Sequence, residues 1–178
     1  MKSTQEVLQS FETTMERYMA ELNELDMNEL LQKENEEEWS IGQMYVHLIQ
    51  SALFMQLRNI ERCLANDEQT VHADTEKTEL GSQIFELGQF PPIRVKLPAS
   101  PQYIPQPPES KQQLFEGLQQ VLEQMRSKAA VLDEVTIGRK VLHPSMGALN
   151  AQEWFELIAM HYRHHFLQLD RLKLNLGL

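Results

Sequence analysis

The sequence contains a single cysteine, Cys63, among its 178 residues. One cysteine excludes an intrachain disulfide framework and leaves no pair of thiolates for a structural zinc site. Long apolar runs are also missing. No stretch approaches the roughly 18 apolar residues of a membrane span, and the first residues lack the apolar core of a signal peptide. We therefore expect a cytoplasmic protein that does not enter the membrane.

Positive charge is scarce in this chain. Sixteen Lys and Arg face 26 Asp and Glu, which gives a formal net charge of -10, and no basic cluster interrupts the pattern. Proteins that bind a phosphate backbone usually present a basic face, so we expect no nucleic-acid partner. Apolar residues make up 42% of the chain and charged residues 24%. This composition and length predict a single globular domain over residues 1–178.

Proline is nearly absent except in one segment, where seven of the eight prolines lie between residues 91 and 108. These prolines exclude a continuous helix there, and the whole connection over residues 66–109 exceeds the roughly two to eight residues usual between neighbouring helices. About 20 extended residues reach about 60 Å, whereas a helix of 25 residues spans about 37 Å. We therefore predict a crossover that lets the third helix run parallel to the second. Its expected apolar anchors are Ile93, Val95, Leu97, Tyr103 and Ile104.

Helical periodicity marks four segments of the chain. They cover approximately residues 4–25, 40–64, 110–135 and 150–175. The last three begin with a capping-box pattern, a Ser or Asn three residues before a Gln or Glu. The pairs are Ser40 and Gln43, Ser110 and Gln113, and Asn150 and Glu153. The sequence thus predicts an all-α protein built on four long helices.

Three of the six histidines lie close together in the stretch "AMHYRHHFLQ", residues 159–168. His161 and His165 are four residues apart and share a helix face that also carries Trp154 and Ile158, whereas His164 lies to one side. Two imidazoles at this spacing can grip one metal ion. The same pair could equally be a hydrogen-bonded feature of the core or its rim, without a metal.

His47 is the candidate for a third ligand. It lies about 10 Å from the start of the second helix, and His165 lies about 14 Å from the end of the fourth. If these two helices run antiparallel, His47, His161 and His165 reach similar levels. The alternative for His47 is a single buried histidine that is bonded to a neighbour.

Two quoted stretches resemble the DinB/YfiT-like superfamily of metal-dependent proteins. They are "WSIGQMYVHLIQ" and, about a hundred residues later, "HPSMGALNAQEWFELIAMHYRHHFLQLDRLK". The resemblance implies a four-helix bundle of up-down-down-up topology. It also implies a divalent metal, nickel or zinc, held by His47, His161 and His165. Some relatives transfer low-molecular-weight thiols such as bacillithiol.

The resemblance and the donor set together favour a metal-dependent enzyme, either a hydrolase or a low-molecular-weight thiol S-transferase with a small-molecule substrate. Three neutral imidazoles leave coordination positions open, as in catalytic zinc sites. The alternatives are a bundle that binds metal without turnover and a dimerising helical protein. A homodimer is also expected, because bundles of this size often dimerise.

Other polar residues near the predicted cluster have less specific roles. Gln168, Gln43 and Ser51 share its helical phase and could orient the imidazoles, but we favour solvated or interhelical roles for them. Arg163 is expected to pair at the surface.

Three further residues have structural interpretations. His143 precedes a proline and is expected to shape the turn before the fourth helix. Cys63 is expected to be a small core residue rather than a nucleophile. Trp39, at the start of the second helix, is expected to anchor the core.

Overall fold

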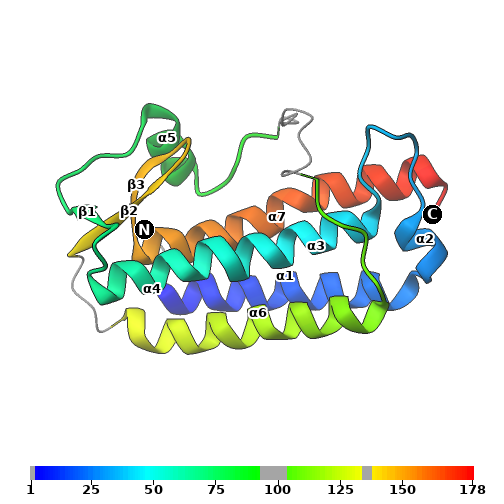
Figure 1. The fold of residues 1–178 in the computed structure, drawn as a ribbon, viewed down its shortest axis with the longest axis horizontal. Helices are drawn as coiled ribbons and strands as arrows, with labels where there is room; N and C mark the ends of the chain where they lie inside the picture. The colour runs from blue at the N-terminus through cyan, green and yellow to red at the C-terminus, as the bar shows by residue number, and fades with distance from the viewer. Residues whose placement is uncertain (1–2, 93–103, 134–137) are drawn as a thin grey trace.

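The computed structural model describes residues 3–92, 104–133 and 138–178 (Figure 1). Within these ranges the chain is mostly helical. The elements are α1 (Thr4–Glu24), α2 (Met27–Leu31), α3 (Ile41–Ser51), the π-helix η1 (Ala52–Gln56), α4 (Leu57–Ala65), β1 (Val71–His72), α5 (Glu79–Leu87), α6 (Lys111–Leu132), β2 (Arg139–His143), β3 (Gly147–Asn150) and α7 (Ala151–Leu176).

The four predicted long helices are confirmed as α1, the continuous run α3–η1–α4, α6 and α7. Ser40 and Asn150 close the predicted capping boxes of α3 and α7. At α6 only half of the box forms. The Ser110 side chain accepts from the N–H of Gln113, but the Gln113 side chain accepts from the N–H of Glu109 instead. These caps satisfy amide groups that the first turn of a helix leaves unpaired, and so determine where each helix begins.

Helices α1 and α7 run in the same direction. The Ser10 hydroxyl near the start of α1 bonds Arg163 at 3.3 Å. Further along both helices, Arg17 pairs with Asp170 at 2.8 Å. Residue numbers therefore rise together along the contact, and the colour gradient of Figure 1 shows the same direction for both helices.

The run α3–η1–α4 lies against α7 in the opposite direction and against α6 in the same direction. Its contact with α6 runs from Ile49 beside Gly117 to Glu61 paired with Lys128. A Cβ on Gly117 would lie 2.8 Å from the Cδ1 atom of Ile49, so glycine permits this close approach. The interior between these helices is filled by buried apolar side chains contributed by all four.

A small antiparallel sheet of order β1-β2-β3 covers the start of α7 and is an addition to the mostly helical fold that the sequence predicted. Its strands have only two to five residues, which is too short for an alternating pattern to stand out in the sequence. Gly147 permits the β2–β3 turn because its φ is +77° and an added Cβ would lie 2.6 Å from the nitrogen of Thr78. The short helices α2 and α5 were not predicted either.

The predicted crossover contains β1 and α5, and its end contacts α3. The carbonyl of Pro105 accepts a hydrogen bond from the Gln43 side chain at 2.8 Å. The expected anchor Ile104 is exposed, so that part of the prediction is wrong. The other anchors, Ile93, Val95, Leu97 and Tyr103, lie outside the described residues.

None of the described helices combines the length and the apolar content that crossing a lipid bilayer requires.

Candidate metal centre

His47, His161 and His165 come together between α3 and α7. His47 lies in the second turn of α3, which Ser40 caps, while His161 and His165 lie one turn apart in the middle of α7. One ring nitrogen from each histidine lies within 4.8 Å of the others. The two helices are antiparallel, so the three histidines lie at similar levels along them, as the sequence predicted.

The nitrogens that face one another are the Nε2 atoms. His161 Nε2 lies 3.2 Å from His47 Nε2 and 3.0 Å from His165 Nε2. Two imidazoles on one tetrahedral ion, with metal–nitrogen bonds of about 2.0–2.1 Å, have their nitrogens about 3.3 Å apart. The observed separations are close to this value, so the three side chains fit a small divalent cation.

The remaining ring nitrogens of two histidines have side-chain neighbours, and one of these assigns a tautomer. His165 Nδ1 lies 2.8 Å from the Oε1 atom of Gln168, to which it donates as N–H. His165 Nε2 therefore carries a lone pair towards the cluster. His47 Nδ1 lies 3.5 Å from the Ser51 hydroxyl. Gln168 thus orients an imidazole, so the solvated or interhelical role favoured from the sequence is wrong for this residue.

If His161 Nε2 carries a proton, it can donate a good hydrogen bond to only one of its two neighbours, His47 Nε2 or His165 Nε2. A cation at the centre would accept lone pairs from all three rings, which makes this arrangement better suited to an ion than to hydrogen bonds alone. Gln43, by contrast, has a structural role, since its side chain bonds the Pro105 carbonyl of the crossover and caps α3.

Burial keeps the three imidazoles neutral. Desolvation lowers the pKa of His47 to about 4 and that of His165 to about 3, and it holds the pKa of His161 well below its ordinary value. The neighbouring rings lower the pKa of His161 and His165 further. Neutral imidazole is the form that ligates a metal, so the site is ready to bind one near pH 7 without releasing protons from these rings.

Two aromatic rings flank the cluster from different segments. The Trp39 ring lies 5.0 Å from the His47 ring, and the Phe90 ring lies 6.4 Å from the His161 ring. Trp39 is only half-buried, so it lines the site rather than anchoring the core as expected. Sequence reasoning missed Phe90, because nothing in the pattern of the crossover indicates which of its apolar residues meets α7.

Arg163 explains how Phe90 reaches the cluster. The guanidinium bonds the Ser10 hydroxyl and donates to the carbonyl of Gly88 at 2.9 Å. Gly88 ends α5 with a φ of +64°. Arg163 thus ties the end of α5 to α7, rather than pairing at the surface as expected, and Phe90 follows two residues later.

His164 lies beside the cluster but outside it. Its ring is 5.4 Å from that of Phe90 and 5.8 Å from that of His165. Its angular position on the predicted helix had already placed His164 to one side of His161 and His165.

The interpretations of His143 and Cys63 are confirmed. His143 Nδ1 accepts from the amides of Ser145 and Met146 at 3.2 Å, which shapes the turn between β2 and β3. Cys63 is buried, and burial raises the pKa of its thiol to about 11, so it is not a ready nucleophile.

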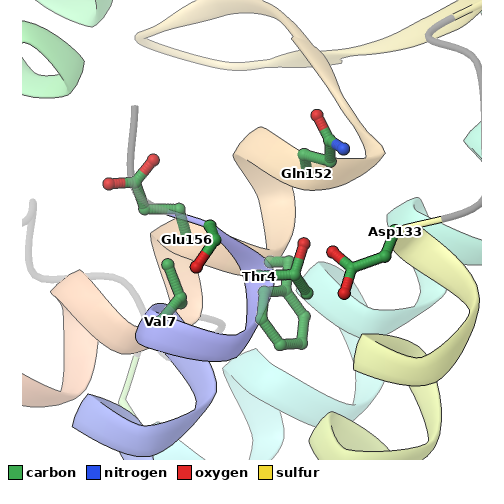
Figure 2. A pocket seen from close by; sticks show the side chains of 7 residues that line it. Thr4, Val7, Asp133, Gln152 and Glu156 are labelled. Atoms are coloured by element: carbon green, nitrogen blue, oxygen red, sulfur yellow. The ribbon is translucent and has the colours of Figure 1, made fainter.

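A separate cavity of about 120 Å³ lies where the start of α1, the end of α6 and the first turns of α7 meet (Figure 2). Figure 2 shows Asp133 and Thr4 on one side of it and Glu156 on another. None of the three clustered histidines lines this cavity, so it is distinct from the candidate metal centre.

The fold and the site together define a mostly helical protein with a three-histidine cluster between two antiparallel helices. The sequence model of the DinB superfamily matches residues 10–169, and the chain therefore belongs to this superfamily. The resemblance inferred from the sequence is confirmed. Neither a curated protein nor a solved structure matches the chain.

Proposed function

We propose that the protein is a metal-dependent enzyme in which His47, His161 and His165 hold one divalent ion, nickel or zinc. The observation that carries this proposal is the mutual approach of the three Nε2 atoms, at 3.2 and 3.0 Å around His161. A divalent ion bound there supplies Lewis acidity, which lowers the pKa of a coordinated water or thiol. The cluster contains no carboxylate, so its ligands leave the charge of the ion uncompensated.

The neighbouring side chains have supporting roles in this proposal. Gln168 and Ser51 hold the rings of His165 and His47 in orientation. Trp39 and Phe90 present apolar surface beside the imidazoles and limit the access of water. A reactant would then approach a cation whose ligands are held in orientation by polar side chains and flanked by aromatic rings.

Thiol S-transfer is the reaction that these surroundings favour. Among the described residues, the side chains that contact the clustered rings are those of Ser51, Gln168, Trp39, Phe90 and His164. None of these five is a carboxylate that would serve as general base for hydrolysis. In the transfer, a new S–C bond forms at an electrophilic carbon, the bond to the leaving group breaks, and the thiol proton passes to solvent. The expected substrate is a small molecule, with a low-molecular-weight thiol of the bacillithiol type as cosubstrate. Hydrolysis is the second candidate, because three neutral ligands are also typical of catalytic zinc.

Several broader features belong to the same proposal. The four long helices form an up-down-down-up bundle within one domain of residues 1–178. The protein works in the cytoplasm without a nucleic-acid or membrane partner, and it forms a homodimer.

Metal analysis tests the proposal most directly. Protein purified without a histidine tag should contain one nickel or zinc ion per chain, identified by elemental analysis and by anomalous scattering at the metal edges. His165→Ala should abolish this content. His72→Ala is the matched control, because His72 is exposed on β1 and should keep wild-type metal content.

Turnover assays then separate the candidate functions. We expect the wild type and His72→Ala to join a thiol to an electrophilic aryl halide, and His165→Ala to be inactive. Ester or amide cleavage without thiol consumption would favour the hydrolase. Stoichiometric metal without turnover of either substrate would indicate a non-catalytic metal-binding protein. A metal-free wild type with unchanged stability after chelation would leave the dimerising helical protein.

A further inference from the structure

The three clustered histidines remain partly open to solvent. His47, His161 and His165 are each half-buried, although they lie between two long helices. The inner side of the cluster is closed by the apolar core that α1 and α6 share with these helices. Figure 1 shows α5 and the chain that follows it on the side of α7 opposite to α6. A small molecule that reaches the histidines therefore comes from the outer side, and the side chains that border the cluster there decide which molecule fits.

Trp39 borders the cluster next to His47. Its ring lies 5.0 Å from the His47 ring and is half-buried. The preceding residue, Glu38, is 9% exposed and accepts from both terminal nitrogens of the Arg171 guanidinium, each at 3.2 Å. The following residue, Ser40, caps α3. Trp39 is thus held between a contact to α7 and the start of α3, so its ring keeps its place beside the cluster without being part of the core.

Phe90 borders the cluster next to His161. Its ring lies 6.4 Å from the His161 ring and 5.4 Å from the His164 ring, and it is half-buried like that of the tryptophan. Arg163 donates to the carbonyl of Gly88 at 2.9 Å and so fixes the chain two residues earlier. The helix that supplies two of the three ligands therefore also holds both segments that carry the aromatic rings.

Two aromatic rings beside a cation select by shape and by charge. An aromatic ring binds another flat ring in stacked or edge-to-face geometry, which strengthens binding about 2–10-fold beyond the burial of apolar area. Aromatic rings also attract ammonium groups. A divalent ion on three neutral ligands keeps its positive charge, however, and repels a second cation nearby. The surroundings of the cluster therefore favour an uncharged aromatic group over an ammonium group.

We propose that Trp39 and Phe90 are specificity-determining residues, and that the substrate is an uncharged electrophile with an aromatic ring next to the reacting carbon. This inference rests on the proposed function, because the metal centre determines where the reaction takes place. The substrate ring packs against the two side chains and places the neighbouring carbon beside the histidines. In a benzylic halide the S–C bond to the thiol forms at this carbon, the carbon–halogen bond breaks with both electrons on the halide, and the thiol proton passes to solvent.

The first test measures binding without reaction. Benzyl alcohol and cyclohexylmethanol are unreactive and similar in size, but only the first has a flat aromatic ring. We expect the Zn²⁺-loaded wild type to bind benzyl alcohol about 2–10-fold more tightly, relative to the partition of the two alcohols into octanol. Nuclear magnetic resonance gives both Kd values from the indole N–H signal of Trp39. The signal of Trp154, the second of the two tryptophans, should not move, because that ring is fully buried.

The second test removes the aromatic rings one at a time. Phe90→Leu and Trp39→Leu keep an apolar side chain but lose the ring. We expect each to raise the KM for benzyl chloride about 2–10-fold. The kcat should stay within about twofold, because the ring binds the substrate and the transition state alike. The zinc content of both variants should equal that of the wild type.

Phe85→Leu is the matched control, because it makes the same change in the same crossover. The Phe85 ring is half-buried on α5 and lies 5.5 Å from Nζ of Lys77. Lys77 pairs with Glu153, about two turns of α7 before His161. This variant should keep the wild-type KM for benzyl chloride.

The outcomes separate this inference from the proposed function. Equal affinity of the wild type for the two alcohols, on the same octanol scale, would overturn the substrate class and leave the metal-dependent reaction standing. So would wild-type KM values in both Phe90→Leu and Trp39→Leu. A wild type that contains no metal and joins no thiol to a halide would overturn both.

Discussion

Helix α7 has two buried faces, and they differ in the partners of their polar groups. Towards α1, the Tyr18 hydroxyl donates to the carbonyl of Tyr162 at 2.7 Å, and the Tyr45 hydroxyl donates to the carbonyl of Tyr18 at 2.9 Å. Towards α3, the Nε2 atoms of His161 and its two neighbours converge on each other.

The difference separates a structural face from a candidate functional one. Burial raises the pKa of Tyr18 and Tyr45, so both phenols stay protonated and remain donors to backbone carbonyls. Burial lowers the pKa of the three clustered histidines, so they stay neutral and present lone pairs. On the tyrosine face the Tyr18 and Tyr45 hydroxyls have backbone acceptors, whereas on the histidine face a cation would give the three Nε2 atoms a common partner.

The largest effect should come from the structural face. Phe11 is fully buried and packs edge-to-face on Tyr162 at 5.2 Å. Phe11→Ala should lower the free energy of unfolding by about 3–5 kcal/mol, because a large cavity replaces the ring. The Kd for metal, measured below the melting temperature, should not change. A weaker metal affinity in the folded variant would mean that the two faces are coupled.

Acid should act mainly through the histidine face. The folded-state pKa of His47, about 4, lies below its ordinary value of 6.5, so folding favours the neutral ring. Its contribution to stability is complete above pH 6.5 and is lost as the pH falls towards 4, at up to about 1.4 kcal/mol per pH unit. Urea titrations of the metal-free protein at pH 7, 6 and 5 measure this loss. His47→Gln should show a shallower decline than the wild type, and equal slopes would contradict the prediction.

We expect an intermediate effect on metal affinity from changing Gln168, which orients the His165 ring. Gln168→Ala removes the acceptor of the His165 Nδ1–H and should raise the Kd for Zn²⁺ about 10–100-fold. Gln152→Ala is its control, because Gln152 lies on the same helix as Gln168 but away from the cluster, where its amide donates to the carbonyl of Leu132 on α6. Competition titrations with a chromophoric chelator measure both. The comparison fails if the two variants weaken binding equally.

The smallest effect should come from a single hydroxyl on the tyrosine face. Tyr18→Phe removes the hydrogen bond to the carbonyl of Tyr162 and should destabilise the protein by about 1 kcal/mol. Metal content and affinity should match those of the wild type. Loss of metal from this variant would show that the tyrosine face helps to position the histidines.

The regular parts of the fold could be predicted because their signals are local. Ser40 and Asn150 begin their helices through side chains that bond amides within the same turn. The short strands and α5 escaped prediction because contacts distant in sequence stabilise them. Lys77, for example, pairs with the buried carboxylate of Glu153, and the amide of Thr78 donates to the carbonyl of Met146. The π-helical turn at Ala52–Gln56 also had no local signal.

The candidate site also has a part that the sequence predicts and a part that only the tertiary structure decides. The spacing of His161 and His165 determines by itself that their rings share one helix face, because helix geometry is fixed by the backbone. Only tertiary packing decides that His47 meets them from α3 and that Phe90 reaches the cluster from the crossover. Periodicity relates residues within one helix, whereas contacts between helices depend on the volumes and register of all the side chains that fill the space between them.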